Sequence, residues 1–248
     1  MLTITRQQMK SLQRVMLDRF ERRLLAHIEE FFPTHWRVIG ANQMAEVVRF
    51  GVRRAQELGY RTERDGYLFH SLMLYLGSHF DTDPQYPWLA SALGDQDVGS
   101  PSVRLANAHD AAMEFLDDVA GPHGEHAEIA LQRLQSTFMP ELRREKNASF
   151  DYLLRILHET WPKKLERVRE HGVRAMTNSV MPIAKNIGMR TSADVCLYVV
   201  ASFFFGHGMA RDPQFPWVGR LLMQAAGDGG SAQSFPELFD LHLRSVNA

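Results

Sequence analysis

Apolar side chains recur along this chain at the three- or four-residue spacing of an amphipathic helix. Over about residues 6 to 32 the apolar positions are Met9, Leu12, Met16, Phe20, Leu24, Ile28 and Phe31. This spacing places them along one side of a helix. Further helices are predicted over about residues 42–58, 63–76, 84–93, 102–119 and 125–134. No segment shows the period-two alternation of a half-buried strand, so the sequence predicts an all-α protein.

A repeated loop divides the chain into two similar parts. Residues 81–88 read DTDPQYPW and residues 209–217 read MARDPQFPW, so Trp217 lies 129 residues after Trp88. At the same offset Gly77 matches Gly206, Asp65 matches Asp194, Thr62 matches Thr191, Gly59 matches Gly188 and Leu24 matches Leu153. Identities at one constant offset predict an internal duplication, with two tandem copies of a helical bundle unit related by a pseudo-twofold.

The glycine-rich stretch at residues 120–126, AGPHGEH, is the predicted junction between the copies. It assigns residues 1–122 to the first copy and residues 123–248 to the second. Because the junction is short, we expect the two copies to pack together as one globular body.

Most of the repeated residues have a structural explanation, and we interpret them as anchors of the fold. In the T-x-x-D pattern the threonine is expected to cap a helix and the aspartate to lie near the positive helix end. In the Asp-Pro pair we expect aspartate as N-cap and proline as the first helical residue, with the following tryptophan anchoring a short helix. The anchors are Thr62, Asp65, Asp83, Pro84 and Trp88 in the first copy, and Thr191, Asp194, Asp212, Pro213 and Trp217 in the second.

Composition and charge narrow the class of protein. The net charge is −1, so no global field attracts nucleic acid or an anionic membrane. The single cysteine, Cys196, excludes an internal disulfide and fits a reducing compartment. The N-terminus shows no apolar segment of a secretory signal, and the most apolar stretch, residues 195–205, is too short to cross a bilayer. We therefore expect a cytoplasmic protein with no membrane insertion.

The sharpest enzymatic alternative is a metal-dependent phosphohydrolase. His109-Asp110 is an HD dipeptide in a helical protein, and helical HD-type hydrolases use such groups on a metal. Further metal-ligating types in the same half are His70, His79, Asp81 and Asp83. The second copy replaces the first three by Val199, Gly208 and Ala210. An HD dipeptide often arises by chance, and a role in helix packing or at the surface explains His109 and Asp110 more simply than a metal site. The chain also lacks the nucleophile and zinc-protease signatures. We expect no catalytic residue, no cofactor and no metal.

Four short motifs carry a family resemblance. They are the opening I-T-R-Q-Q-M, the Phe-Pro pair after the first long helix, the G-x-R-T-x-x-D step and the D-P-x-x-P-W loop. Together they resemble a group of uncharacterised helical bacterial proteins encoded in type VI secretion clusters, beside PAAR-tip, adaptor and effector genes. The resemblance implies a non-catalytic, protein-binding role as an accessory factor (co-chaperone) for an effector. Its alternative implication is an immunity protein that neutralises a cognate toxin.

The predicted partner-binding residues lie where the two copies differ most. Residues 78–82 read SHFDT and residues 207–211 read HGMAR, although the flanking glycine and Asp-Pro pair are retained. A loop facing a partner is free to change in this way, as is an exposed loop without a function. The hypothesis names His79, Asp81, Thr82, His207 and Arg211. The expected partner is another protein, an effector or its adaptor, and not nucleic acid; the oligomeric state stays open.

Overall fold

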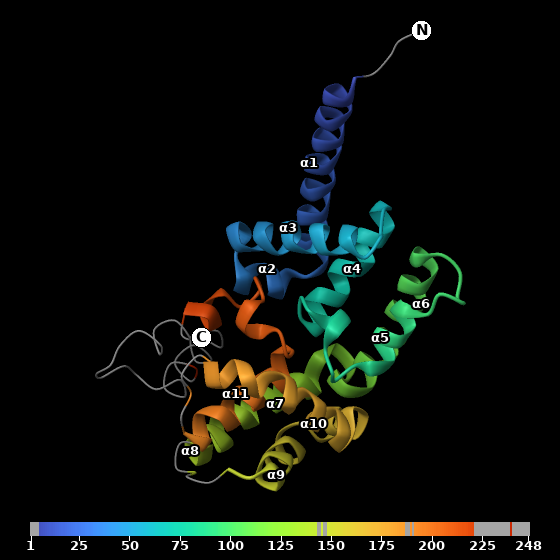
Figure 1. Cartoon of the computed structure of the whole chain (residues 1–248). Helices are drawn as coiled ribbons and strands as arrows, with labels where there is room; N and C mark the ends of the chain where they lie inside the picture. The colour runs from blue at the N-terminus through green and yellow to red at the C-terminus, as the bar shows by residue number, and fades with distance from the viewer. Residues whose placement is uncertain are drawn as a thin grey trace.

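The structure, a computed structural model, describes residues 5–142, 145, 148–186, 189, 191–220 and 239. All regular structure in these residues is helical, which confirms the all-α prediction (Figure 1). The first part contains α1 (Arg6–Phe31), α2 (Pro33–Ile39), α3 (Ala41–Glu57), α4 (Glu63–Leu76), η1 (Phe80–Thr82), α5 (Pro87–Gly94) and α6 (Pro101–Ala120). The second contains η2 (Pro122–Gly124), α7 (Glu125–Arg133), the π-helical η3 (Leu134–Phe138), α8 (Met139–Leu142), α9 (Phe150–Thr160), α10 (Pro162–Asn186), α11 (Ser192–Phe205) and η4 (Met209–Arg211).

Threonine side chains start three of the helices. The Thr5 hydroxyl accepts from the amide of Gln8 and opens α1, while the Thr62 hydroxyl accepts from the amide of Asp65 at 3.1 Å and opens α4. Thr191 accepts from the amide of Asp194 at 3.0 Å and opens α11. These bonds satisfy amide groups that have no partner inside the helix. The predicted capping roles of Thr62 and Thr191 are confirmed.

Element boundaries in the two parts recur at the sequence offset of 129 residues. α4 begins at 63 and ends at 76, and α11 begins at 192 and ends at 205. η1 and η4 keep the same relation. The backbone turns at Gly40, between α2 and α3, with φ +80° and ψ 149°; the position 129 residues on, Arg169 inside α10, has φ 60° and ψ 166°. α10 therefore follows the combined course of α2 and α3.

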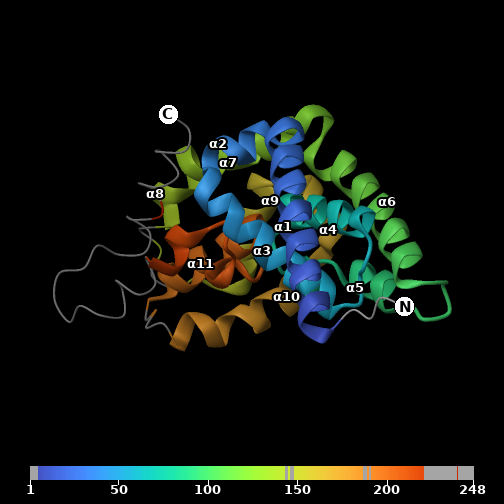
Figure 2. The same ribbon diagram turned by 90° about the horizontal axis from the view of Figure 1, so that it is seen from above.

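Each part of the chain has its own apolar core, built around one central helix. In α4, buried side chains include Phe69, Leu72 and Met73, and α11 is buried over most of its length. This agrees with a segment that is apolar nearly all round. The C-terminal half of α1 packs on the first core through Leu24 and Ile28. Its N-terminal end projects beyond the other helices (Figure 1), and Figure 2 shows α1 crossing above α3 and α4.

One helix was missed, one predicted helix cap was misplaced and one predicted helix start was wrong. Pro33 opens α2, a helix that the pattern does not predict, because a Phe-Pro pair after a long helix is typical of a helix end. The sequence predicts Ser102 as a helix cap, but α6 already begins at Pro101, and the Ser102 hydroxyl donates to the carboxylate of Asp65 at 2.9 Å. No helix starts at Pro84: α5 begins at Pro87, so Asp83 does not cap it.

The equivalent Asp-Pro pair of the second part behaves in the same way. Pro213 lies in a turn, and the next helical stretch among the described residues begins at Pro216. The tryptophans do lie in the first turn, partly buried. The Trp88 ring centroid is 5.7 Å from that of Phe115, and the Trp217 centroid is 5.6 Å from that of Phe239.

Candidate functional site

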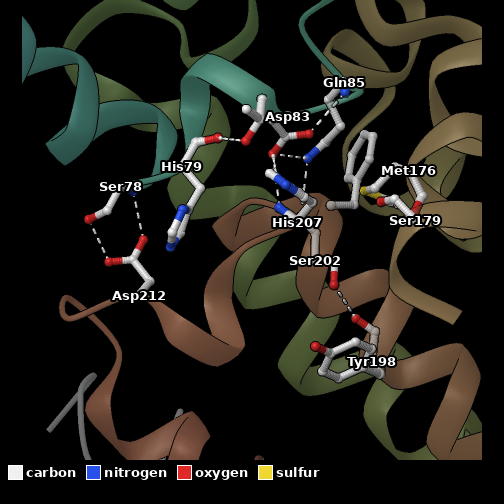
Figure 3. Close-up of polar contacts among 12 residues, drawn as sticks. Ser78, His79, Asp83, Gln85, Met176, Ser179, Tyr198, Ser202, His207 and Asp212 are labelled. Carbon is white, nitrogen blue, oxygen red and sulfur yellow. Dashed lines mark hydrogen bonds and ion pairs between the residues drawn. The ribbon is translucent and has the colours of Figure 1, made fainter. Parts of the chain in front are cut away.

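Two buried aspartates join the two parts of the chain at the seam shown in Figure 3. The Asp83 carboxylate accepts from the backbone N–H of His207 at 2.8 Å. The Asp212 carboxylate accepts from the backbone N–H of Ser78 at 2.7 Å and from its hydroxyl at 2.6 Å. Burial raises the pKa of Asp212, and the bonds from Ser78 and Gln214 oppose that rise. The Asp83 and Asp212 side chains thus bind across the seam instead of capping helices.

Two glutamines extend the seam to the central helices. The Gln85 side-chain amide donates to the carbonyl oxygen of Ser202 at 3.1 Å, and that of Gln214 donates to the carbonyl oxygen of Met73 at 2.7 Å. Each contact has its counterpart 129 residues along: Ser78 with His207, Asp83 with Asp212, Gln85 with Gln214 and Met73 with Ser202. The seam is therefore reciprocal, as an isologous interface between two like subunits would be.

The chain backbones approach closely beside this seam at two glycines. Gly77 has φ +92° and Gly206 has φ +89°. A Cβ atom at Gly77 would lie 2.9 Å from the carbonyl oxygen of Phe205, and one at Gly206 would lie 3.1 Å from that of Leu76. Both positions favour glycine, because the left-handed backbone and the neighbouring carbonyl each disfavour a side chain.

The predicted partner-binding loops are only partly accessible. The Asp81 side chain is 5 % exposed and pairs with Arg54 at 2.5 Å. The ring centroids of His79 and Phe50 are 5.3 Å apart, and burial lowers the pKa of His79. The His207 side chain is 13 % exposed, with Nδ1 3.3 Å from an Asp83 carboxylate oxygen.

Only Thr82 and Arg211 among these five residues are exposed. Partner binding by the five residues remains a prediction, and a partner could reach only these two exposed side chains without a change in the loops. A charge-reversing substitution at Asp81 would break its ion pair with Arg54. Such a variant would therefore disturb folding and could not test partner binding alone.

The HD dipeptide does not gather metal ligands around it. His109 Nε2 lies 3.0 Å from the Ser71 hydroxyl, and the Asp110 side chain, 3.8 Å from Nδ1, is 83 % exposed. His70 lies in the core, where its ring nitrogens face the carbonyl oxygens of Gly66 and Val48. Among the described residues, no three His, Cys, Asp or Glu side chains are grouped as a metal site would need.

A cavity of about 840 Å³ lies between the two parts, with Phe32, Tyr75, Trp161 and Phe204 in its aromatic wall. Lys164 also contributes to the wall, is only 3 % exposed and donates to the carbonyl oxygen of Phe203. Burial lowers the pKa of Lys164 to about 7, and Asp83 opposes the shift.

Sequence reasoning missed Lys164, since residues 163–174 look like a solvated charged face. The offset was an available signal, because position 164 corresponds to His35. His35 lines the same cavity, and burial lowers its pKa against a hydrogen bond to the backbone of Leu74. Leu74 itself corresponds to Phe203, so each basic side chain binds the last turn of its central helix.

An apolar stripe on the projecting half of α1 is open to solvent. Met9, Leu12, Val15 and Met16 are 43 %, 50 %, 47 % and 62 % exposed. Beside the stripe a groove of about 600 Å³ runs between α1, α3 and α4, lined by Met16, Phe20, Val52 and Tyr60 among others. We call these residues of α1 the α1 stripe and this hollow the α1 groove. The sequence pattern predicted the helix but not that its apolar face is uncovered.

No family model matches this chain, and neither a curated protein nor a solved structure matches it. Among the helices that the structure describes, none combines the length and the apolar character needed to cross a membrane. The function is accordingly inferred from the residues of the chain itself.

Proposed function

We propose that this chain is a non-catalytic protein-binding protein that captures its partner on the α1 stripe. The observation that carries the proposal is the exposure of four large apolar side chains on a helix that projects from the body. Contiguous exposed apolar surface of this kind is typical of interaction sites, because it costs solubility unless a partner covers it. The buried polar groups of the seam, by contrast, bind one another and hold the fold.

The described residues of the second part show no counterpart of the α1 stripe. α9 begins at Phe150, the position equivalent to Glu21, so that helix lacks the segment corresponding to residues 6–20. The fully buried residues of α1 begin at Leu24, and within residues 6–20 only Leu17 and Phe20 pack against the first core. The four side chains of the α1 stripe lie outside this core, so their exposure is better explained by binding than by stability.

The family resemblance supports a specific setting for this binding. The I-T-R-Q-Q-M opening and the repeated Asp-Pro loops resemble proteins of type VI secretion clusters. We infer a cytoplasmic accessory factor, or co-chaperone, for an effector of such a cluster. An immunity protein that binds a cognate toxin uses the same kind of surface and is the alternative.

Co-purification from native cells tests this proposal. Wild-type chain is expected to bring down an effector together with its adaptor if it is an accessory factor, and an effector alone if it is an immunity protein. Replacing Met9, Leu12 and Met16 by glutamine should abolish the capture while leaving the thermal melt unchanged. The matched control replaces Val98, Val103 and Ile129, which are similarly exposed on other elements. Equal capture by both triple variants would contradict the proposal.

We also infer that the chain arose by internal duplication, which gives its two parts a pseudo-twofold relation. The support is threefold: identities at one offset, helix boundaries at the same offset, and reciprocal hydrogen bonds across the seam. Unrelated helical segments would have no reason to agree in all three. Equivalent substitutions in the two parts should therefore have equal effects, which the glycine variants described below test.

A further inference from the structure

We propose that the α1 stripe and the α1 groove bind an acidic amphipathic helix supplied by the partner. This inference rests on the proposed function and adds the chemistry of the partner segment. It follows from three properties of the surface: the line of its apolar side chains, the charge around them and the hollow beside them.

The apolar side chains form a line that matches one face of a helix. Met9, Leu12 and Met16 follow one another at spacings of three and four residues, and Phe20 continues the line into the groove. From residue 9 to residue 20 the rise along α1 is about 16 Å. A partner helix of about three turns covers that length, and its own apolar residues at the same spacing would pack between these side chains.

The segment of α1 that carries this apolar line has a high positive charge. Residues 6–20 contain four basic residues, at 6, 10, 14 and 19, and one acidic residue, Asp18, so the segment carries a formal charge of +3 on a chain of net charge −1. Arg6, Arg14 and Arg19 make no ion pair with any other described residue. Glu63, which lines the groove, is already paired with Arg23. The surface thus offers unpaired cations along an apolar line, and Arg14 lines the groove itself; carboxylates on a partner complement them.

The same charge disfavours a second copy of this chain as the occupant. Two α1 helices that paired along their stripes would bring +3 against +3 in either orientation, and like charges at an interface cost free energy. A carboxylate-rich helix is attracted to this basic segment, whereas a second copy of the chain is repelled by it.

The hollow beside the stripe favours a helix over a bilayer surface. Phe20, Val52 and Tyr60 lie within the groove, where the walls of α3 and α4 rise beside α1. A flat membrane surface contacts the outer side of α1 and leaves this hollow unfilled. A helix can insert large side chains into it and cover the half-buried ring of Phe20.

Fluorescence anisotropy with designed peptides tests the inference on the full-length protein. The probes are an amphipathic helical peptide of leucine and glutamate and the same peptide with lysine in place of glutamate. We expect the glutamate peptide to bind, more tightly as the salt concentration falls, and the lysine peptide not to bind. Arg14→Glu with Arg19→Glu should weaken the glutamate peptide by at least about tenfold. The triple glutamine variant of the stripe should abolish its binding.

Controls separate this inference from the broader proposal. Arg37→Glu with Lys185→Glu reverses exposed charges on α2 and α10 and should leave the peptide affinity unchanged. Equal binding of both peptides, or unchanged affinity in Arg14→Glu/Arg19→Glu, overturns the acidic-helix inference. The inference is also overturned if the protein sediments with phosphatidylglycerol vesicles but does not bind the glutamate peptide. If the stripe variant loses the native partner while the charge variant retains it, the proposed function stands and this inference falls. If both variants retain that partner, both fall.

Discussion

The buried side chain of Lys164 should make the stability of the protein depend on pH. Its ammonium group lies 4.8 Å from the ring centroids of both Trp161 and Phe203 and donates to one backbone carbonyl. These contacts replace only part of the hydration that an ammonium group has in water. The cost of removing it from water explains why its pKa falls to about 7.

The substitution Lys164→Met should raise stability at low pH and flatten its pH dependence. Between about pH 7 and the ordinary lysine pKa of 10.5 the unfolded chain holds a proton that the folded chain has released. The wild-type free energy of unfolding should therefore rise with pH in this window, by up to about 1.4 kcal/mol per pH unit. The methionine variant lacks this term, so it should be the more stable protein at pH 6 and lose the advantage towards pH 10. Urea melts across this range measure it, and parallel pH profiles for the two proteins would disprove the account of Lys164.

The structural roles predicted for individual residues were right where the interaction is local in the sequence. The Thr62 cap depends on an amide three residues away, so the T-x-x-D pattern was sufficient. Asp83 was misassigned because its long-range partner, the amide of His207, lies 124 residues along the chain. A short pattern such as Asp-Pro fits a helix cap and a turn equally well, and only the tertiary structure distinguishes them.

At the scale of elements, the two parts of the chain pack backbone against backbone at Gly77 and Gly206. Gly77→Ala and Gly206→Ala should each destabilise the protein through two terms, the left-handed backbone and the carbonyl oxygen of the opposite part. Gly59→Ala is the matched control, because Gly59 has φ +88° and open space around its Cβ position. The control should cost about 1–2 kcal/mol.

The two seam variants should each exceed the control by about 1–3 kcal/mol in denaturant melts, as overpacked sites do. The proposed duplication adds that their costs should be similar to each other. Costs no larger than that of the control would mean that the seam relaxes freely. A large difference between Gly77→Ala and Gly206→Ala would count against equivalence of the two parts.

Periodicity predicted the elements well where a helix has clear signals at both ends. The helix over residues 63–76 was predicted with the bounds that α4 has, because a threonine cap precedes it and Gly77 ends it. α2 was missed because it is only seven residues long and contains no buried residue to give a period. Short helices between two turns leave too few positions for the pattern to detect.

At the scale of the whole molecule, two packed parts joined by a reciprocal seam carry one additional segment, the projecting half of α1. The sequence predicted that residues 9, 12 and 16 share a helix face, since spacing alone determines that. It did not predict which part of this face is covered, because coverage depends on where α3 and α4 lie. The candidate site was therefore placed on the loops at residues 78–82 and 207–211, whereas the exposed apolar surface lies on α1.

Site-specific photo-cross-linking in native cells is the most direct test of binding on α1. A benzoyl-phenylalanine residue would be placed at Met16 in one protein and at Thr82, which is exposed on the alternative loop, in another. The account predicts a cross-link from position 16 to the protein that co-purifies with the wild-type chain, and none from position 82. A cross-link to that protein from position 82 without one from position 16 would contradict it.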